Sequence, residues 1–143
     1  MFVREMAITH PNVGMGVNNA LIHCVEQCYA CAQVCSACAD ACLGEDLQPI
    51  PIDCVRLCLD CADLCLAAGA IASRRTAGDE TVIAAALRAC ATACACCAEI
   101  CGHHADHMEH CRICAGQCLD CEKACHEATE NLGGALSPAF LAH

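Results

Sequence analysis

The sequence has almost no aromatic side chains: Phe, Trp and Tyr together make up 2% of its 143 residues, and Trp is absent. A helical domain of this size normally fills its interior with Leu, Ile and Phe, so another residue type must occupy the interior here. Basic residues are also scarce, with 7 Lys and Arg against 17 acidic residues and a formal net charge of −10. That charge argues against partnership with nucleic acid and against docking on an anionic membrane.

Long apolar runs are missing as well. No stretch of about 18 residues is continuously apolar, so we expect no membrane span. The segment from Met1 to Val17 lacks the apolar run of a signal peptide. We therefore expect a cytoplasmic protein. In that reducing compartment, a sequence rich in cysteine is typical of metal binding or catalysis rather than of disulfide bonding.

Cysteine is the residue that is abundant. Of the 20 cysteines, all but Cys96 fall into four groups in which successive positions are three or four residues apart. That alternation is the rhythm of helix positions that face the centre of a bundle. It predicts an all-α fold, an antiparallel up-down-up-down four-helix bundle with a cysteine-lined core. The core cysteines would be Cys24, Cys28, Cys31, Cys35, Cys38, Cys42, Cys54, Cys58, Cys61, Cys65, Cys90, Cys94, Cys97, Cys101, Cys111, Cys114, Cys118, Cys121 and Cys125.

The helices are expected at 17–43, 52–74, 80–104 and 107–131. They would form a single domain over 1–143, with an N-terminal extension at 1–16 and a C-terminal tail at 132–143. All four prolines lie outside the cysteine groups, as helix interiors require.

Helix ends can also be assigned from single residues. Gly44 suits the position just past the first helix. Asp53 and Asp79 are expected to cap the second and third helices. Asp106 followed by Glu109 matches a capping box for the fourth.

The nineteen regularly spaced thiols predict a metal store. A single buried cysteine is often only a small apolar side chain, but Ala, Val or Leu would fill nineteen such positions better. Neighbours along one helix have Cβ atoms about 5–6 Å apart, which is too far for a disulfide. Buried thiolates need their charge neutralised, and Cu(I), a soft monovalent ion, balances thiolates one to one. With each thiolate bridging two ions, capacity would approach roughly one Cu(I) per cysteine.

Two other metals stay open as alternatives. Zinc sequestration is the second candidate, because Cys35, Cys38, Cys58 and Cys61 satisfy a zinc-ribbon spacing. The same rhythm continues on both sides of them, however, where a ribbon would turn. An iron–sulfur electron carrier is the third candidate, weakened by the absence of the bacterial cluster motif. No set of nucleophile, base and orienting group stands out, so an enzyme is not expected.

The two ends of the expected bundle differ in chemistry. One end would be closed by apolar residues: Val17, Leu21, Ala68, Ala72, Ile83, Leu87, Ala128 and Leu132. At the other end the cysteine rhythm extends to His104, His107 and Met108, flanked by His103 and His110. Imidazole and thioether groups bind copper, so we predict that His104, His107 and Met108 line a mouth through which Cu(I) enters. The alternative is a polar helix junction with several exposed histidines.

Leucines outside the cysteine face of the second helix predict association of subunits. They are Leu57, Leu59, Leu64 and Leu66.

The four cysteine segments, Cys28–Cys38, Cys54–Cys65, Cys90–Cys101 and Cys111–Cys121, resemble those of the bacterial copper storage proteins of the cytosolic branch. The resemblance covers about residues 17–131. It implies a homotetramer of four-helix bundles in which the cysteines of each chain bind multiple Cu(I) ions. It also implies storage or detoxification rather than catalysis. A copper chaperone or a small-molecule Cu(I) complex would then be the donor.

Overall fold

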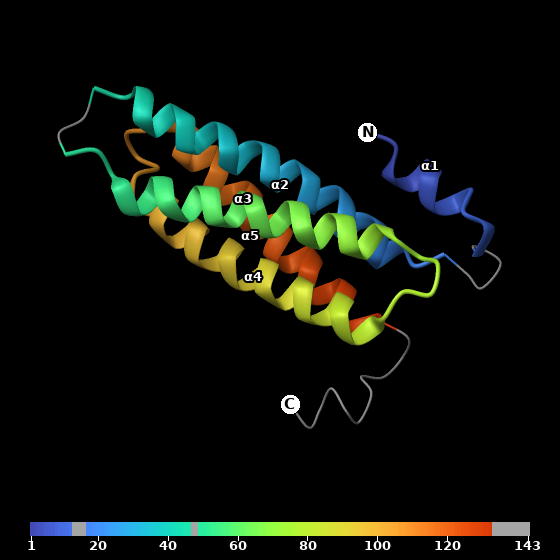
Figure 1. The fold of residues 1–143 in the computed structure, drawn as a ribbon. Helices are drawn as coiled ribbons and strands as arrows, with labels where there is room; N and C mark the ends of the chain where they lie inside the picture. The colour runs from blue at the N-terminus through green and yellow to red at the C-terminus, as the bar shows by residue number, and fades with distance from the viewer. Residues whose placement is uncertain (13–16, 47–48, 133–143) are drawn as a thin grey trace.

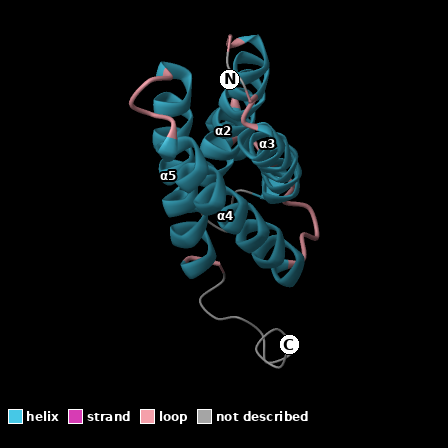
Figure 2. Ribbon diagram, turned by 90° about the vertical axis from the view of Figure 1, so that its left-hand side faces the viewer, coloured by secondary structure: helices cyan, strands magenta, loops and turns pink. Residues whose placement is uncertain are grey.

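The computed structural model describes residues 1–12, 17–46 and 49–132. A short helix, α1 (Val3–Ile8), precedes four long ones: α2 (Asn19–Gly44), α3 (Ile52–Ser73), α4 (Glu80–His103) and α5 (Glu109–Glu130). The described residues contain no strand. Each long helix packs against two others, in the order α2, α3, α4, α5 and back to α2. Short connections alternate between the two ends, which gives the predicted up-down-up-down bundle (Figure 1). Figure 2 shows the four long helices grouped around a common interior.

The bundle forms because the sequence gives each long helix one face of cysteine and alanine. All nineteen regularly spaced cysteines are at most 2% exposed, whereas Cys96 is exposed. Alanines such as Ala39, Ala62 and Ala98 lie beside them in the same core. These small side chains replace the large apolar residues that the composition lacks. The described part of the chain buries no charged or polar residue.

The apolar end of the bundle is confirmed for seven of the eight predicted residues. Leu21, Ala68, Ala72, Ile83, Leu87, Ala128 and Leu132 are buried. The exception is Val17, which is 44% exposed. Its prediction was wrong because α2 begins only at Asn19, and a helical spacing does not extend to a residue that precedes the helix.

The helix caps follow the predictions in part. Asp79 is the N-cap of α4, and its carboxylate accepts hydrogen bonds from the backbone N–H groups of Thr81 and Val82 at 2.8 and 3.3 Å. Asp53 is not a cap, since Pro51 precedes α3. Asp53 lies in the first turn, where a carboxylate favours the positive end of the helix dipole.

The predicted capping box before α5 is wrong. The helix begins after Met108 without a side-chain cap, and the carboxylate of Glu109 instead forms an ion pair with Arg112. Gly44 is the last residue of α2 rather than the residue beyond it.

Helix α1 lies in the segment that was predicted only as an extension. It packs against α2 (Figure 1), and the Arg4 guanidinium donates to the Asn19 side chain at 3.1 Å. His10, just beyond the helix, lies 3.3 Å from the Thr76 hydroxyl. Six residues are too few for a stable isolated helix, so packing on the bundle explains why periodicity did not reveal it.

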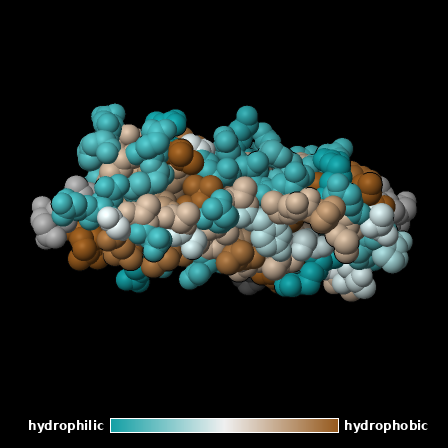
Figure 3. Space-filling model, turned by 90° about the horizontal axis from the view of Figure 1, so that it is seen from above, coloured by the Kyte–Doolittle hydropathy of each residue, from teal (hydrophilic) through white to brown (hydrophobic). Residues whose placement is uncertain are grey.

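Several leucines on α3 remain at the surface, as predicted. Leu59, Leu64 and Leu66 are exposed, whereas Leu57 is half-buried. On the face seen in Figure 3, apolar residues also lie among hydrophilic ones.

Helix α4 has the length and apolar composition to cross a membrane, which the sequence did not predict. Its cysteine face nevertheless packs inside the bundle, so it is a core helix.

Two glycines inside helices provide a matched test of this packing. A Cβ on Gly69 would lie 3.2 Å from the Cβ of Cys28, whereas a Cβ on Gly116 would meet nothing within 4 Å. We expect Gly116→Ala to stabilise the metal-free protein by about 1 kcal/mol, because Ala favours a helix over Gly. Gly69→Ala should give no such stabilisation, because its new methyl group would be crowded against Cys28 of α2. Urea unfolding of the reduced protein measures both, and equal stabilisation by the two variants would contradict the packing described.

Candidate metal centre

The sulfur atoms of the four long helices form one continuous column along the bundle axis. Side chains three and four residues apart share a helix face, and the antiparallel arrangement brings the four faces together. Sulfur–sulfur contacts in the column occur between different helices as well as between neighbours on one helix. Sγ atoms lie 3.5 Å apart in the pairs Cys35–Cys118, Cys58–Cys101 and Cys65–Cys90.

Overlapping sets of four buried sulfurs follow one another along the column, and the four sulfurs of each set lie within 4.8 Å of one another. Each set shares one or two sulfurs with the next. Five of these sets are Cys28, Cys90, Cys121 and Cys125; Cys31, Cys65, Cys94 and Cys121; Cys31, Cys35, Cys61 and Cys118; Cys35, Cys97, Cys114 and Cys118; and Cys38, Cys58, Cys101 and Cys114.

This geometry suits metal ions better than disulfides. All twenty cysteines are free, and their closest sulfur contacts of 3.5 Å greatly exceed the ~2.05 Å of a disulfide. With metal–sulfur bonds of ~2.3 Å, two sulfurs lie about 4.6 Å apart across a linear site and about 4.0 Å apart in a trigonal one. The observed sets match these separations. Sharing of sulfurs between sets also matches thiolates that bridge two ions.

Thiols of the column have pKa values shifted in opposite directions. Burial and the nearby Cys54 sulfur raise the pKa of Cys42 to about 12, and burial likewise raises the pKa of Cys111. At Cys54, hydrogen bonds from Cys101 and Cys58 act in the opposite direction and lower the pKa to about 3. A proton on one sulfur therefore stabilises a thiolate beside it, whereas a second thiolate without a cation is disfavoured.

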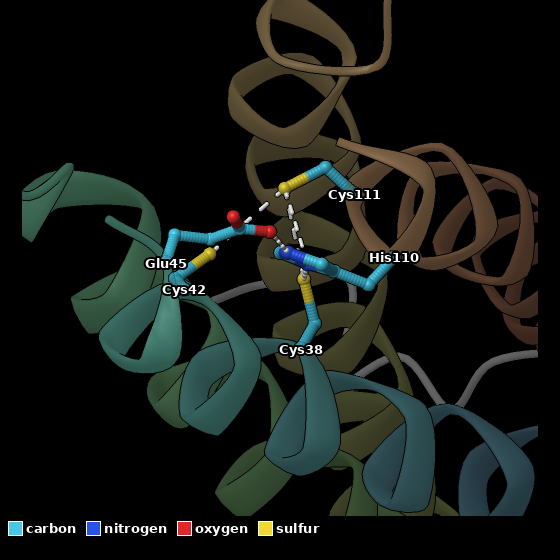
Figure 4. A network of polar contacts seen from close by, with 5 residues as sticks. All are labelled: Cys38, Cys42, Glu45, His110 and Cys111. Carbon is cyan, nitrogen blue, oxygen red and sulfur yellow. Dashed lines mark hydrogen bonds and ion pairs between the residues drawn. The ribbon is translucent and has the colours of Figure 1, made fainter. Parts of the chain in front are cut away.

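At the end of the bundle opposite the apolar end, the side chain of His110 contacts the sulfurs (Figure 4). His110 Nδ1 lies 3.4 Å from Cys38 Sγ and 3.6 Å from Cys111 Sγ. Its Nε2 lies 2.9 Å from the Glu45 carboxylate. Burial acts to lower the pKa of His110, but the contacts with Cys38 and Glu45 raise it overall.

The three predicted mouth residues lie in the same region without such contacts. Met108 is 3% exposed and belongs to the core cluster. His104 is half-buried and His107 is exposed, with their rings edge to face at 6.0 Å. Within the described residues, no hydrogen bond joins either ring to a sulfur.

The cysteine spacing predicts His110 only as a residue that flanks the mouth. That spacing does not hold over residues 104–108, because α4 ends at His103 and α5 begins at Glu109. His110 lies inside α5, four positions before Cys114. That spacing places both side chains on one helix face, and it could have identified His110 as the histidine beside the sulfurs.

The model of the family described as copper storage protein matches residues 17–130. The chain belongs to the copper storage protein family. The match spans all four cysteine-bearing helices, so it confirms the resemblance that the cysteine segments suggested.

Solved structures of family members from Streptomyces lividans share the fold. The copper storage protein loaded with 10 copper equivalents is 46% identical, with a TM-score of 0.87 over 91% of this chain and 99% of that chain. A cytosolic copper storage protein with five coppers is 49% identical, with a TM-score of 0.77 over 80% of this chain and 95% of that chain. A variant of that protein with one histidine replaced by alanine matches equally well. Among curated proteins, none matches the chain.

The burial of the sulfurs predicts the reactivity of the metal-free protein. Cys96 is exposed and the other nineteen cysteines are buried, so an aromatic disulfide reagent should modify one thiol per chain quickly in the reduced native protein. The remaining thiols should react only upon unfolding. Cys96→Ser should remove the fast phase, and rapid reaction of several thiols in that variant would contradict the buried column.

Proposed function

We propose that this chain stores Cu(I) along the whole sulfur column, with the nineteen buried cysteines as ligands. The observation that carries the proposal is the lack of any buried charged or polar residue in the described part of the chain. Apart from the partly exposed His110 at one end of the column, the described residues therefore supply no cation to balance thiolates in the core. The stored ions must provide that balance, and one monovalent ion per thiolate leaves the core neutral.

Zinc sequestration fits this core less well. A Zn²⁺ ion held by four thiolates leaves a double negative charge, and the described core has no residue to offset it. Four-coordinate sites also require four thiolates each. Consecutive sets here share Cys31, Cys35, Cys114, Cys118 and Cys121. Adjacent sets therefore cannot each hold a Zn²⁺ ion with four thiolates of its own. Bridging by thiolates favours the Cu(I) interpretation.

The proposed role is storage and buffering without catalysis. The column occupies the interior that a substrate would need, and its ligands are packed against one another. We propose a single domain with the bundle over 17–131, located in the cytoplasm. The S. lividans relative described as cytosolic supports this compartment. A copper chaperone or a small-molecule Cu(I) complex is the proposed donor.

We also propose that the chain forms a homo-oligomer, with a tetramer as the assembly implied by the family resemblance. The exposed leucines Leu59, Leu64 and Leu66 on α3 support such association, because subunit contacts would remove their side chains from water.

Anaerobic titration of the reduced protein with a Cu(I) chelate tests the capacity. We expect uptake to approach roughly one Cu(I) per buried cysteine, with little Zn²⁺ bound at equal availability. Cys96→Ser should keep the full capacity, whereas replacing Cys35 and Cys118 by Ser should lower it, because both belong to two sets. A plateau at two or three ions would leave most of the column without a function.

We further propose that copper enters at the His110 end, where Met108, His104 and His107 also lie. His110→Ala should slow uptake from a Cu(I) chelate, because its ring is the imidazole in contact with the sulfurs. Joint replacement of His104, His107 and Met108 tests the wider mouth. His126→Ala is the matched control, since this exposed histidine of α5 pairs with Glu122. Stopped-flow rates that are unchanged in both mouth variants would exclude this entrance.

A further inference from the structure

One carboxylate bridges α2 and α5 at the proposed entrance. Glu45 is the C-cap residue of α2, where its backbone leaves the helix in an extended conformation and its N–H donates to the Cys42 carbonyl. Its side chain reaches across to α5, and Oε1 lies 2.9 Å from Nε2 of His110 (Figure 4). Both side chains are partly shielded, with 38% of Glu45 and 24% of His110 exposed.

This contact determines which nitrogen of the ring carries hydrogen. An ionised carboxylate only accepts hydrogen bonds, so Nε2 of His110 is the N–H that donates to Glu45. In the neutral ring the other nitrogen then has a free lone pair. That nitrogen, Nδ1, is the one 3.4 Å from Cys38 Sγ and 3.6 Å from Cys111 Sγ.

We propose that Glu45 is a positioning residue for copper entry, which holds the His110 ring so that Nδ1 faces an incoming Cu(I) beside Cys38 and Cys111. The proposal rests on the proposed function of the column. Histidines that bind metals commonly donate their second ring N–H to a carboxylate, which fixes the tautomer and the ring orientation. In this chain Nε2 of His110 and the Glu45 carboxylate form such a donor–acceptor pair at 2.9 Å.

A plain charge effect is the competing explanation, because any acidic residue at the entrance attracts cations. Asp46 separates the two explanations. It follows Glu45 directly and is exposed, so Asp46→Asn removes one negative charge from the same turn and leaves the contact with His110 intact. Glu45→Gln removes the charge but keeps a side-chain oxygen that accepts from Nε2.

The first measurement is the tautomer of His110 by ¹⁵N NMR of the reduced, metal-free protein. We expect hydrogen on Nε2 in the wild type, in Glu45→Gln and in Asp46→Asn. In Glu45→Ala we expect a mixture of both tautomers. An unchanged tautomer in Glu45→Ala would overturn the proposal, and this result does not depend on copper binding.

The second measurement is the stopped-flow rate at which the first Cu(I) leaves a bicinchoninate complex for the protein. Glu45→Ala should lower this rate by about 10-fold, the lower end of the usual effect of losing such a partner. Glu45→Gln should restore most of it, and Asp46→Asn should match the wild type. Adding Glu45→Ala to His110→Ala should cause no further loss, and a full additional loss would show that Glu45 acts by charge alone.

A measurement of total copper capacity distinguishes a failure of this proposal from a failure of the proposed function. All of these variants should still fill to the wild-type level, because the column below the entrance is unchanged. A wild-type protein that fails to fill would refute storage along the column. A protein that fills normally, at the same initial rate with and without Glu45, would refute only the role of Glu45.

Discussion

The balance of charge on buried sulfur is the constraint on which the rest of this structure depends. Thiolates are expensive in an apolar interior unless a cation lies beside each one. The bundle offers no buried Lys, Arg or His for that purpose among the residues described. In the metal-free protein the thiols therefore keep their protons, except where a neighbouring thiol stabilises a thiolate, and cations must replace protons as further thiolates form. The same atoms serve as apolar packing in one state and as ligands in the other.

This dual use explains the unusual composition. Apart from Met108, the large apolar residues that are buried in the described part of the chain lie toward the closed end, where Ile22 and Leu87 are fully buried. Along the column, alanine accompanies cysteine, and these small side chains let sulfurs from different helices approach to 3.5–4.0 Å. A bulkier core would separate the sulfurs and remove the sharing between sets. The scarcity of aromatic residues is thus a requirement of the site as much as a property of the fold.

The fold and the column could be predicted from the sequence because both follow from one regular spacing inside long helices. All nineteen predicted positions are buried, and Cys96, which breaks the spacing, is exposed. The predictions that failed concern the ends of helices. Val17 precedes α2, and α5 begins after Met108 without the predicted capping box. Residues 104–108 lie between α4 and α5, where a helical spacing does not apply. The contact between Glu45 and His110 joins residues 65 positions apart, and no local pattern specifies it.

The closed apolar end has a consequence for the order in which stored ions move. With the proposed entrance at the His110 end as its opening, the column can fill and empty only from that end. The ion nearest Leu21 and Leu87 must then pass every sulfur between the entrance and its own position. Its departure requires the ions above it to leave or shift first. Transfer from sulfur to sulfur is geometrically available, because the successive sets share members. The last ions to enter would accordingly be the first to leave, and the deepest would be retained longest.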